Sequence, residues 1–141
     1  MLGIVDYGMG NIFSILKATH LVGLKSELVN SPEKIKNYDC LILPGVGAFD
    51  KAIKKLKLDA IDEAIIDFHS TGKYVIGICL GMRLFLDESE EFGIHKGLGL
   101  IKGKCKKIPS IYNERKLNVP HISWNNINIL NHSKPLFANI S

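Results

Sequence analysis

The sequence has no long hydrophobic run, few cysteines and no strong excess of one charge. No apolar stretch approaches the roughly 20 residues that a membrane-spanning helix needs, and the first residues lack the basic segment of a signal peptide. The net charge is +4, without the basic stripe and interleaved aromatic residues that nucleic-acid binding usually shows. We therefore expect a cytoplasmic protein with neither a membrane nor a nucleic-acid partner.

Three cysteines, Cys40, Cys79 and Cys105, are too few and too widely spaced for a disulfide framework or a paired-cysteine zinc site. Cys40 lies inside an apolar run and is expected in the core. Cys105 lies among lysines, where a solvated basic strand is the simplest interpretation and partner docking the alternative. We therefore expect no metal. We also expect no cofactor, because the glycine-rich turn at 8–11 has Phe13 where a dinucleotide-binding motif needs its third glycine.

The composition is that of an ordinary globular protein, with 46% hydrophobic and 23% charged residues among 141. This length suits one compact domain covering residues 1–141. Short apolar runs alternate with amphipathic segments, which predicts an α/β fold with an open, mainly parallel sheet. The strands are expected at 2–6, 25–29, 38–43 and 74–78, and the helices at 11–22, 31–37, 48–56, 58–69 and 80–85.

The pattern changes after the fifth expected helix. Residues 87–91 are acidic and are expected to be a solvated stretch. Residues 98–108 and 119–130 alternate loosely between apolar and polar side chains, which predicts antiparallel strands added at an edge of the sheet.

The strongest chemical signal is Gly77-Ile78-Cys79-Leu80-Gly81, at a predicted strand-to-helix junction. A nucleophile between two glycines at this spacing is typical of a sharp turn that exposes the reactive atom. The helix N-terminus favours the thiolate, which is the reactive form of cysteine. The N–H of Leu80 would lie near an oxyanion formed by attack. A buried cysteine at the end of a strand is the alternative, but the two glycines favour a catalytic Cys79.

A second glycine-rich segment, residues 44–49, follows another predicted parallel strand. The carboxyl ends of parallel strands meet at one edge, so this loop should lie near Cys79. Its backbone N–H groups are suited to stabilise a developing negative charge. On its own the segment indicates only a tight turn.

A cysteine that attacks an amide also needs a group to protonate the leaving nitrogen, and histidine is the usual donor. None of the five histidines has a sequence context that predicts this role. His121 stands beside Trp124 and Asn125 in a predicted strand, where a structural or contact role is expected.

Four segments taken together resemble the glutaminase subunit of imidazole glycerol phosphate synthase, a class I, triad-type glutamine amidotransferase of histidine biosynthesis. They are IVDYGMGN, LPGVGAF, GICLGMR with ESEEFG, and VPHISWN, in that order along nearly the whole chain. The resemblance implies a flavodoxin-like fold in which a cysteine releases ammonia from L-glutamine. It also implies a heterodimer with a cyclase subunit, a (β/α)8 barrel that uses the ammonia.

The resemblance assigns roles to single residues. Cys79 matches the nucleophile, and the N–H groups of Val46 and Leu80 match the oxyanion donors. Gly45 and Gly47 match the adjustable loop beside the substrate, and Arg83 occupies a substrate-binding position where the family usually has Gln. The positions that match the interface with the cyclase are Asn11, His121, Trp124 and Asn125.

This sequence also departs from the family's pattern in two further ways. Ser123 replaces a usual Gly, and the family's triad His and Glu lie in a later stretch that has no counterpart here. We therefore expect the fold to be truncated at its C-terminal side, and the 141-residue chain alone to have little glutaminase activity. The alternatives are a paralogous subunit that feeds ammonia to another synthase, a non-catalytic module that docks on a barrel, and a cysteine hydrolase or glyoxalase-like enzyme of a related fold.

Overall fold

The computed structural model describes residues 1–126. The chain divides into two compact units, Met1–Lys107 and Ile108–Ser141, and the second is described as far as residue 126. All four predicted strands and all five predicted helices of the first 85 residues are present, with bounds that differ by a few residues.

The first unit is built on a four-stranded parallel sheet in the order β2-β1-β3-β4. Its strands are β1 (Leu2–Val5), β2 (Ser26–Val29), β3 (Cys40–Leu43) and β4 (Tyr74–Gly77). In β3, Leu41, Ile42 and Leu43 are all buried, as expected for a central strand covered on both faces. This confirms the predicted open α/β sheet.

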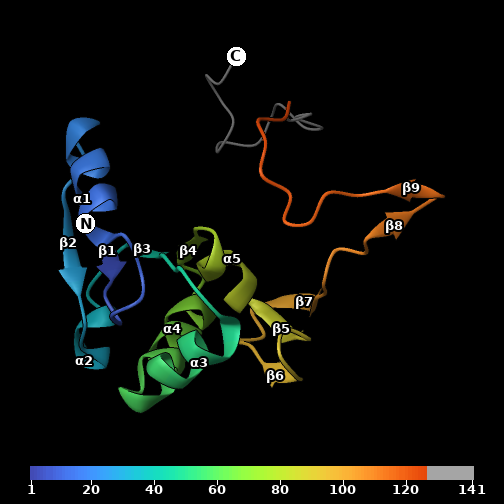
Figure 1. Cartoon of the computed structure of the whole chain (residues 1–141). Coiled ribbons are helices and arrows are strands. Elements are labelled where there is room, and N and C mark those ends of the chain that lie inside the picture. The colour runs from blue at the N-terminus through green and yellow to red at the C-terminus, as the bar shows by residue number, and fades with distance from the viewer. Residues whose placement is uncertain (127–141) are drawn as a thin grey trace. The chain divides into compact units, whose positions relative to one another are not determined.

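Helices lie on both faces of the sheet (Figure 1). α1 (Ile12–Leu21) packs over β1 and β2, where the hydroxyls of Thr19 and Ser26 are 2.6 Å apart. On the other face, α4 (Ile61–Ser70) packs against α2 (Pro32–Ile35) and α3 (Phe49–Leu58). The main core lies between these helices and the sheet, and Phe49, Leu56 and Ile65 are completely buried in it.

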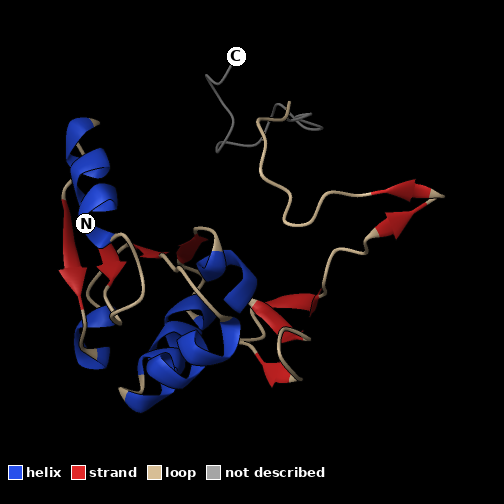
Figure 2. Cartoon of the chain, viewed as in Figure 1, coloured by secondary structure: helices blue, strands red, loops and turns tan. Residues whose placement is uncertain are grey.

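A separate three-stranded sheet follows α5 (Leu80–Leu84), in the order β6-β5-β7 (Figure 2). Its strands are β5 (Leu86–Ser89), β6 (His95–Lys96) and β7 (Ile101–Cys105). The expected solvated acidic stretch is wrong, because most of it forms β5, whose acidic side chains pair with lysines of β7. The strand expected at 98–108 is present as β7, but it runs parallel to β5 in this separate sheet. The antiparallel partner of β5 is β6, which lies outside the predicted range.

The second unit contains a short hairpin of β8 (Ile111–Tyr112) and β9 (Arg115–Lys116), which the sequence did not predict. Its turn uses Asn113 and Glu114, both with positive φ. Residues 119–126 form no strand, so the expected strand at 119–130 is wrong over that part. Positions 127–130 lie outside the described residues.

One face of β4 is open. Tyr74, Ile76 and Ile78 point away from the main core and are 79%, 42% and 40% exposed. Among the helices of residues 1–126, none combines the length and the apolar character that crossing a membrane requires.

Candidate active site

Cys79 occupies the sharp turn between β4 and α5. Its backbone has φ 55° and ψ −113°, a conformation that a residue with a side chain rarely adopts. The turn is closed by the Gly81 N–H, which donates to the Ile78 carbonyl at 3.0 Å, and the Cys79 carbonyl accepts from the Arg83 N–H. The thiol is exposed. Such strain is usually kept where it positions a functional group.

The two flanking glycines are required by close backbone packing. A Cβ on Gly77 would lie 2.6 Å from the Met82 backbone nitrogen, and a Cβ on Gly81 would overlap the Leu43 carbonyl oxygen. These contacts bring the start of α5 against the ends of β3 and β4. The spacing of the glycines therefore predicted the local structure for the right physical reason.

The glycine-rich loop after β3 packs directly against this turn. A Cβ on Gly45 would lie 2.9 Å from the Gly81 nitrogen and from Leu80. The Ile78 N–H donates to the Leu43 carbonyl at 3.0 Å. The sequence prediction that the 44–49 loop and the cysteine turn share one edge of the sheet is thus confirmed.

Tyr7, which the sequence analysis did not single out, fixes the beginning of this loop. Its hydroxyl donates to the Pro44 carbonyl at 2.9 Å, and its side chain is buried. Burial raises the pKa of Tyr7 to about 12, so the hydroxyl remains a donor at neutral pH. In the sequence, only the position of Tyr7 just after β1 could have indicated that it contacts this loop.

The N–H groups of the two expected oxyanion donors are unpaired in the described part of the chain. Within residues 1–126, neither the Val46 N–H nor the Leu80 N–H donates a hydrogen bond to another group. The Val46 side chain is 54% exposed, whereas the Leu80 side chain is completely buried. Gly47 has φ 95°, a conformation that glycine adopts without strain.

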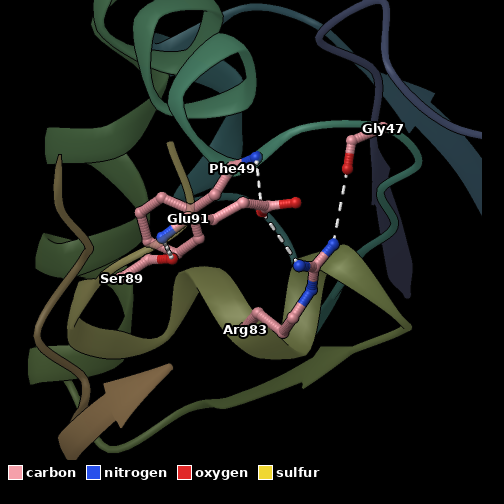
Figure 3. A network of polar contacts seen from close by, with 5 residues as sticks. All are labelled: Gly47, Phe49, Arg83, Ser89 and Glu91. Atoms are coloured by element: carbon pink, nitrogen blue, oxygen red, sulfur yellow. Dashed lines mark hydrogen bonds and ion pairs between the residues drawn. The ribbon is translucent and has the colours of Figure 1, made fainter. Parts of the chain in front are cut away.

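Arg83, on α5, forms a polar network with the loop (Figure 3). Its Nη1 donates to Glu91 Oε2 at 3.0 Å, and its Nη2 donates to the Gly47 carbonyl at 3.4 Å. The same Glu91 oxygen accepts from the Phe49 N–H at 3.1 Å. Glu91 was missed by the sequence analysis because it stands in a run of acidic residues with no helical spacing to Arg83.

A cavity of about 430 Å³ lies beside this network. Its lining combines both charge signs with a thiol and an aromatic ring: Arg83, Glu90, Glu91, Phe92, Cys105, Lys106 and Lys107. Cys79 is not in the lining. Residues 1–126 bring together no cluster of three or more metal-ligating side chains.

The four expected interface residues belong to different units. Asn11 is the N-cap of α1, and its Oδ1 accepts from the Ser14 N–H at 3.4 Å. In the second unit, His121 Nε2 lies 3.0 Å from Asn125 Nδ2. The Trp124 side chain is exposed within its unit.

Comparison with solved structures shows the class of protein to which this fold belongs. A crystal structure of a glutamine amidotransferase matches 74% of this chain and 55% of its own, with a TM-score of 0.65 and 19% identity. A putative peptidase E protein from Listeria monocytogenes matches 71% of this chain and 62% of its own, with a TM-score of 0.57 and 17% identity. The flavodoxin-like fold of class I glutamine amidotransferases is therefore the fold of this chain.

Sequence comparisons identify the family. The CobB/CobQ-like glutamine amidotransferase domain matches residues 11–112. Imidazole glycerol phosphate synthase subunit HisH of Sulfurimonas denitrificans is 46% identical over 99% of this chain, and that of Bacillus subtilis is 44% identical over 94%. The chain belongs to this HisH family of glutamine amidotransferases, and it spans 67% and 63% of the length of these two relatives.

Proposed function

We propose that the chain provides the nucleophile-bearing part of a glutaminase subunit that releases ammonia from L-glutamine. The observation that carries this proposal is the position of Cys79. Its exposed thiol stands on a strained turn, next to a loop whose Val46 N–H is free of partners within the described residues. Membership in the HisH family supports glutamine as the substrate.

The proposed chemistry begins with attack of the Cys79 sulfur on the carboxamide carbon of glutamine. The carbonyl oxygen becomes an oxyanion, which the N–H groups of Val46 and Leu80 stabilise. The tetrahedral intermediate then breaks its C–N bond, and the nitrogen leaves with one added proton as ammonia. Water hydrolyses the resulting γ-glutamyl thioester to glutamate and restores the thiol. Gly45 and Gly47 flank the substrate and let the loop adjust.

We further propose that the ammonia passes to a cyclase subunit with a barrel fold, in a heterodimer that makes imidazole glycerol phosphate. Asn11, His121, Trp124 and Asn125 are the proposed contact residues. Ammonia must stay unprotonated and away from bulk water to act as a nucleophile, so an interface over the site protects it. The name of the relatives as synthase subunits supports a partner of this kind.

Labelling with a chloroketone analogue of glutamine tests the proposed nucleophile. Peptide mass analysis should find the label on Cys79 and not on Cys40 or Cys105, and Cys79→Ala should abolish it. Cys105→Ser is the matched control, which should label like the unchanged chain. Equal labelling of all three cysteines would contradict the proposal.

The 141 residues alone are proposed to have little glutaminase activity, because none of their five histidines has a sequence context that suits the proton donor to the leaving nitrogen. Losing such a group costs roughly 10²–10⁴ in rate. Glutamate production should stay near background even with a cyclase added. Turnover that Cys79→Ala abolishes would contradict this.

A paralogous subunit serving a different synthase is the second candidate. Arg83 favours it, because an arginine paired with Glu91 replaces the family's usual glutamine at this position. Adding the cyclase of imidazole glycerol phosphate synthesis distinguishes the two: a stable complex supports the first, and no binding supports the second.

A further inference from the structure

The segment that joins the glycine-rich loop to α3 is held at both ends by one ion pair. Arg83 Nη2 binds the Gly47 carbonyl, and Glu91 Oε2 binds the Phe49 N–H (Figure 3). Arg83 Nη1 and the same Glu91 oxygen join the two contacts at 3.0 Å. A carboxylate from beyond β5 and a guanidinium from α5 thus clamp three consecutive residues.

The two ends of this segment differ in freedom. Phe49 is completely buried and begins α3. The N-cap of α3 is Ala48, which has no side-chain oxygen, so the Glu91 carboxylate accepts the first helical N–H in its place. Gly47 has no such anchor in the core. It has a positive φ and no side chain, and within residues 1–126 its carbonyl is held by the bond from Arg83.

We propose that Arg83 and Glu91 are positioning residues, which fix the conformation of the 45–47 loop and so the direction of the Val46 N–H toward the Cys79 site. This inference rests on the proposed function, because it assigns the pair to oxyanion stabilisation at that site. It differs from the substrate contact that the family resemblance implies for Arg83.

The contacts that Arg83 already makes argue against a role for it in binding the substrate directly. Both terminal nitrogens of the guanidinium already donate, and the Glu91 oxygen already accepts twice. Each side chain is 30% exposed, so the pair is shielded more than a surface ion pair. A ligand carboxylate that took the place of Glu91 at Nη1 would also remove the cap of α3.

Three electrophiles separate positioning from substrate contact. The first is the chloroketone analogue of glutamine, with its α-amino and α-carboxylate groups. The second is a matched chloroketone without these charges. Both form an oxyanion when the thiol adds to the ketone, whereas the third, iodoacetamide, reacts by direct displacement and forms none. Labelling rates of Cys79 in the full 141-residue chain are compared for the three.

Arg83→Met should slow both chloroketones to the same extent, on the order of ten-fold, as expected for a small displacement of a positioning group. Labelling by iodoacetamide should not change. Glu91→Gln should act in the same way, and the double variant should be no slower than the slower single variant, because the two side chains act through each other. Arg83→Lys should restore part of the rate.

Lys102→Met is the matched control, because the exposed ammonium of Lys102 on β7 pairs with Asp87 on the adjacent strand β5. It should leave all three rates unchanged. Slowing of the charged chloroketone alone would overturn the inference in favour of a substrate contact. Slowing of iodoacetamide as well, no slowing of either chloroketone, or multiplicative effects in the double variant would also overturn it. If the unchanged chain shows no preference for the glutamine analogue, glutamine recognition fails while equal slowing in the variants still supports positioning.

Discussion

Gly81 is the residue whose replacement should cost most at the turn, because its backbone lies against the end of β3. A Cβ there would overlap the Leu43 carbonyl oxygen, which belongs to a central strand and cannot move away. Gly81→Ala should therefore lower the free energy of unfolding by about 2–3 kcal/mol. Urea unfolding followed by circular dichroism measures the change.

Gly72→Ala is the control for this prediction. Gly72 has φ 82° but open space where a Cβ would stand, so only backbone strain opposes the change. Its cost should be about 1 kcal/mol. Equal costs at the two positions would show that the close approach to β3 is not what requires glycine at 81.

Two tyrosines should make the free energy of unfolding fall as the pH becomes alkaline. Burial raises the pKa of Tyr7 to about 12. Burial and a hydrogen bond to Glu27 raise the pKa of Tyr38 to about 12 from an ordinary value of 10.0. Because the folded chain holds the neutral form, this stabilisation is complete below pH 10 and is lost as the pH rises through about 12.

The measurement is the free energy of unfolding just below pH 10 and again close to pH 12. Tyr38→Phe and Tyr7→Phe should each reduce the loss between the two conditions. The loss should not vanish, because a hydrogen bond to Glu88 raises the pKa of Lys104, and its contribution disappears in the same direction. A pH dependence that neither tyrosine variant alters would show that the two phenols do not cause it.

The sequence could predict the sharp turn at Cys79 but not the contacts of Glu91, and the reason is physical. Both glycines stand within two residues of Cys79, so the pattern can be seen in a short stretch of sequence even though Gly81 packs against Leu43 of β3. Glu91 acts on Phe49, 42 positions away, and on Arg83 across a turn and a strand. Nothing in the neighbouring residues distinguishes it from Glu90, which pairs with Lys106 at 4.0 Å.

At the scale of elements, β3 and β4 offer a matched comparison. Ile42 and Ile76 are register partners on the same face of the sheet, but Ile42 is 6% exposed and Ile76 is 42% exposed. Replacing Ile42 with Thr should lower the free energy of unfolding by about 2 kcal/mol, because apolar surface is lost and a hydroxyl is buried. Ile76→Thr should cost less than about 1 kcal/mol. Urea unfolding of both variants at several protein concentrations gives the comparison.

Equal losses would show that the outer face of β4 is covered in solution. If the cost of Ile76→Thr also rose with protein concentration, a second copy of the chain would be the cover. A difference that is independent of concentration is the expected result.

The elements that could be predicted are those whose own residues determine them. The apolar run of β3 and the helical spacing of α3 and α4 were sufficient to predict these elements. In each case the apolar side chains that form the pattern are those buried in the core. β5 could not be predicted, since its acidic side chains suit a strand only beside the lysines of β7. Those ion pairs, at 3.6 and 2.6 Å, join residues that are 15 or 16 positions apart in the chain.

At the scale of the whole chain, the sequence predicted one domain, and the contacts within the chain separate two compact units. Every residue of the main core lies between Val5 and Leu98. From Ile108 to residue 126, all side chains except Leu117 are exposed. The alternation of apolar and polar side chains in this part of the sequence predicted more strand than is present. Such a pattern does not show whether a partner strand lies near enough to pair.

This division predicts where a protease cuts first. Trypsin should cleave early after Lys107, Arg115 or Lys116. The fragment that starts at Met1 should then resist, because the core and the side chains packed against it end at Leu100. Mass analysis over time identifies the cuts, and circular dichroism of the purified fragment should show the helices retained. The internal control is Lys73, whose ammonium binds the carbonyls of Lys36 and Tyr38 and which should remain uncut in the same samples. Early cleavage within α3 or α4, or loss of helix once the second unit is removed, would mean that the first unit depends on the residues that follow it.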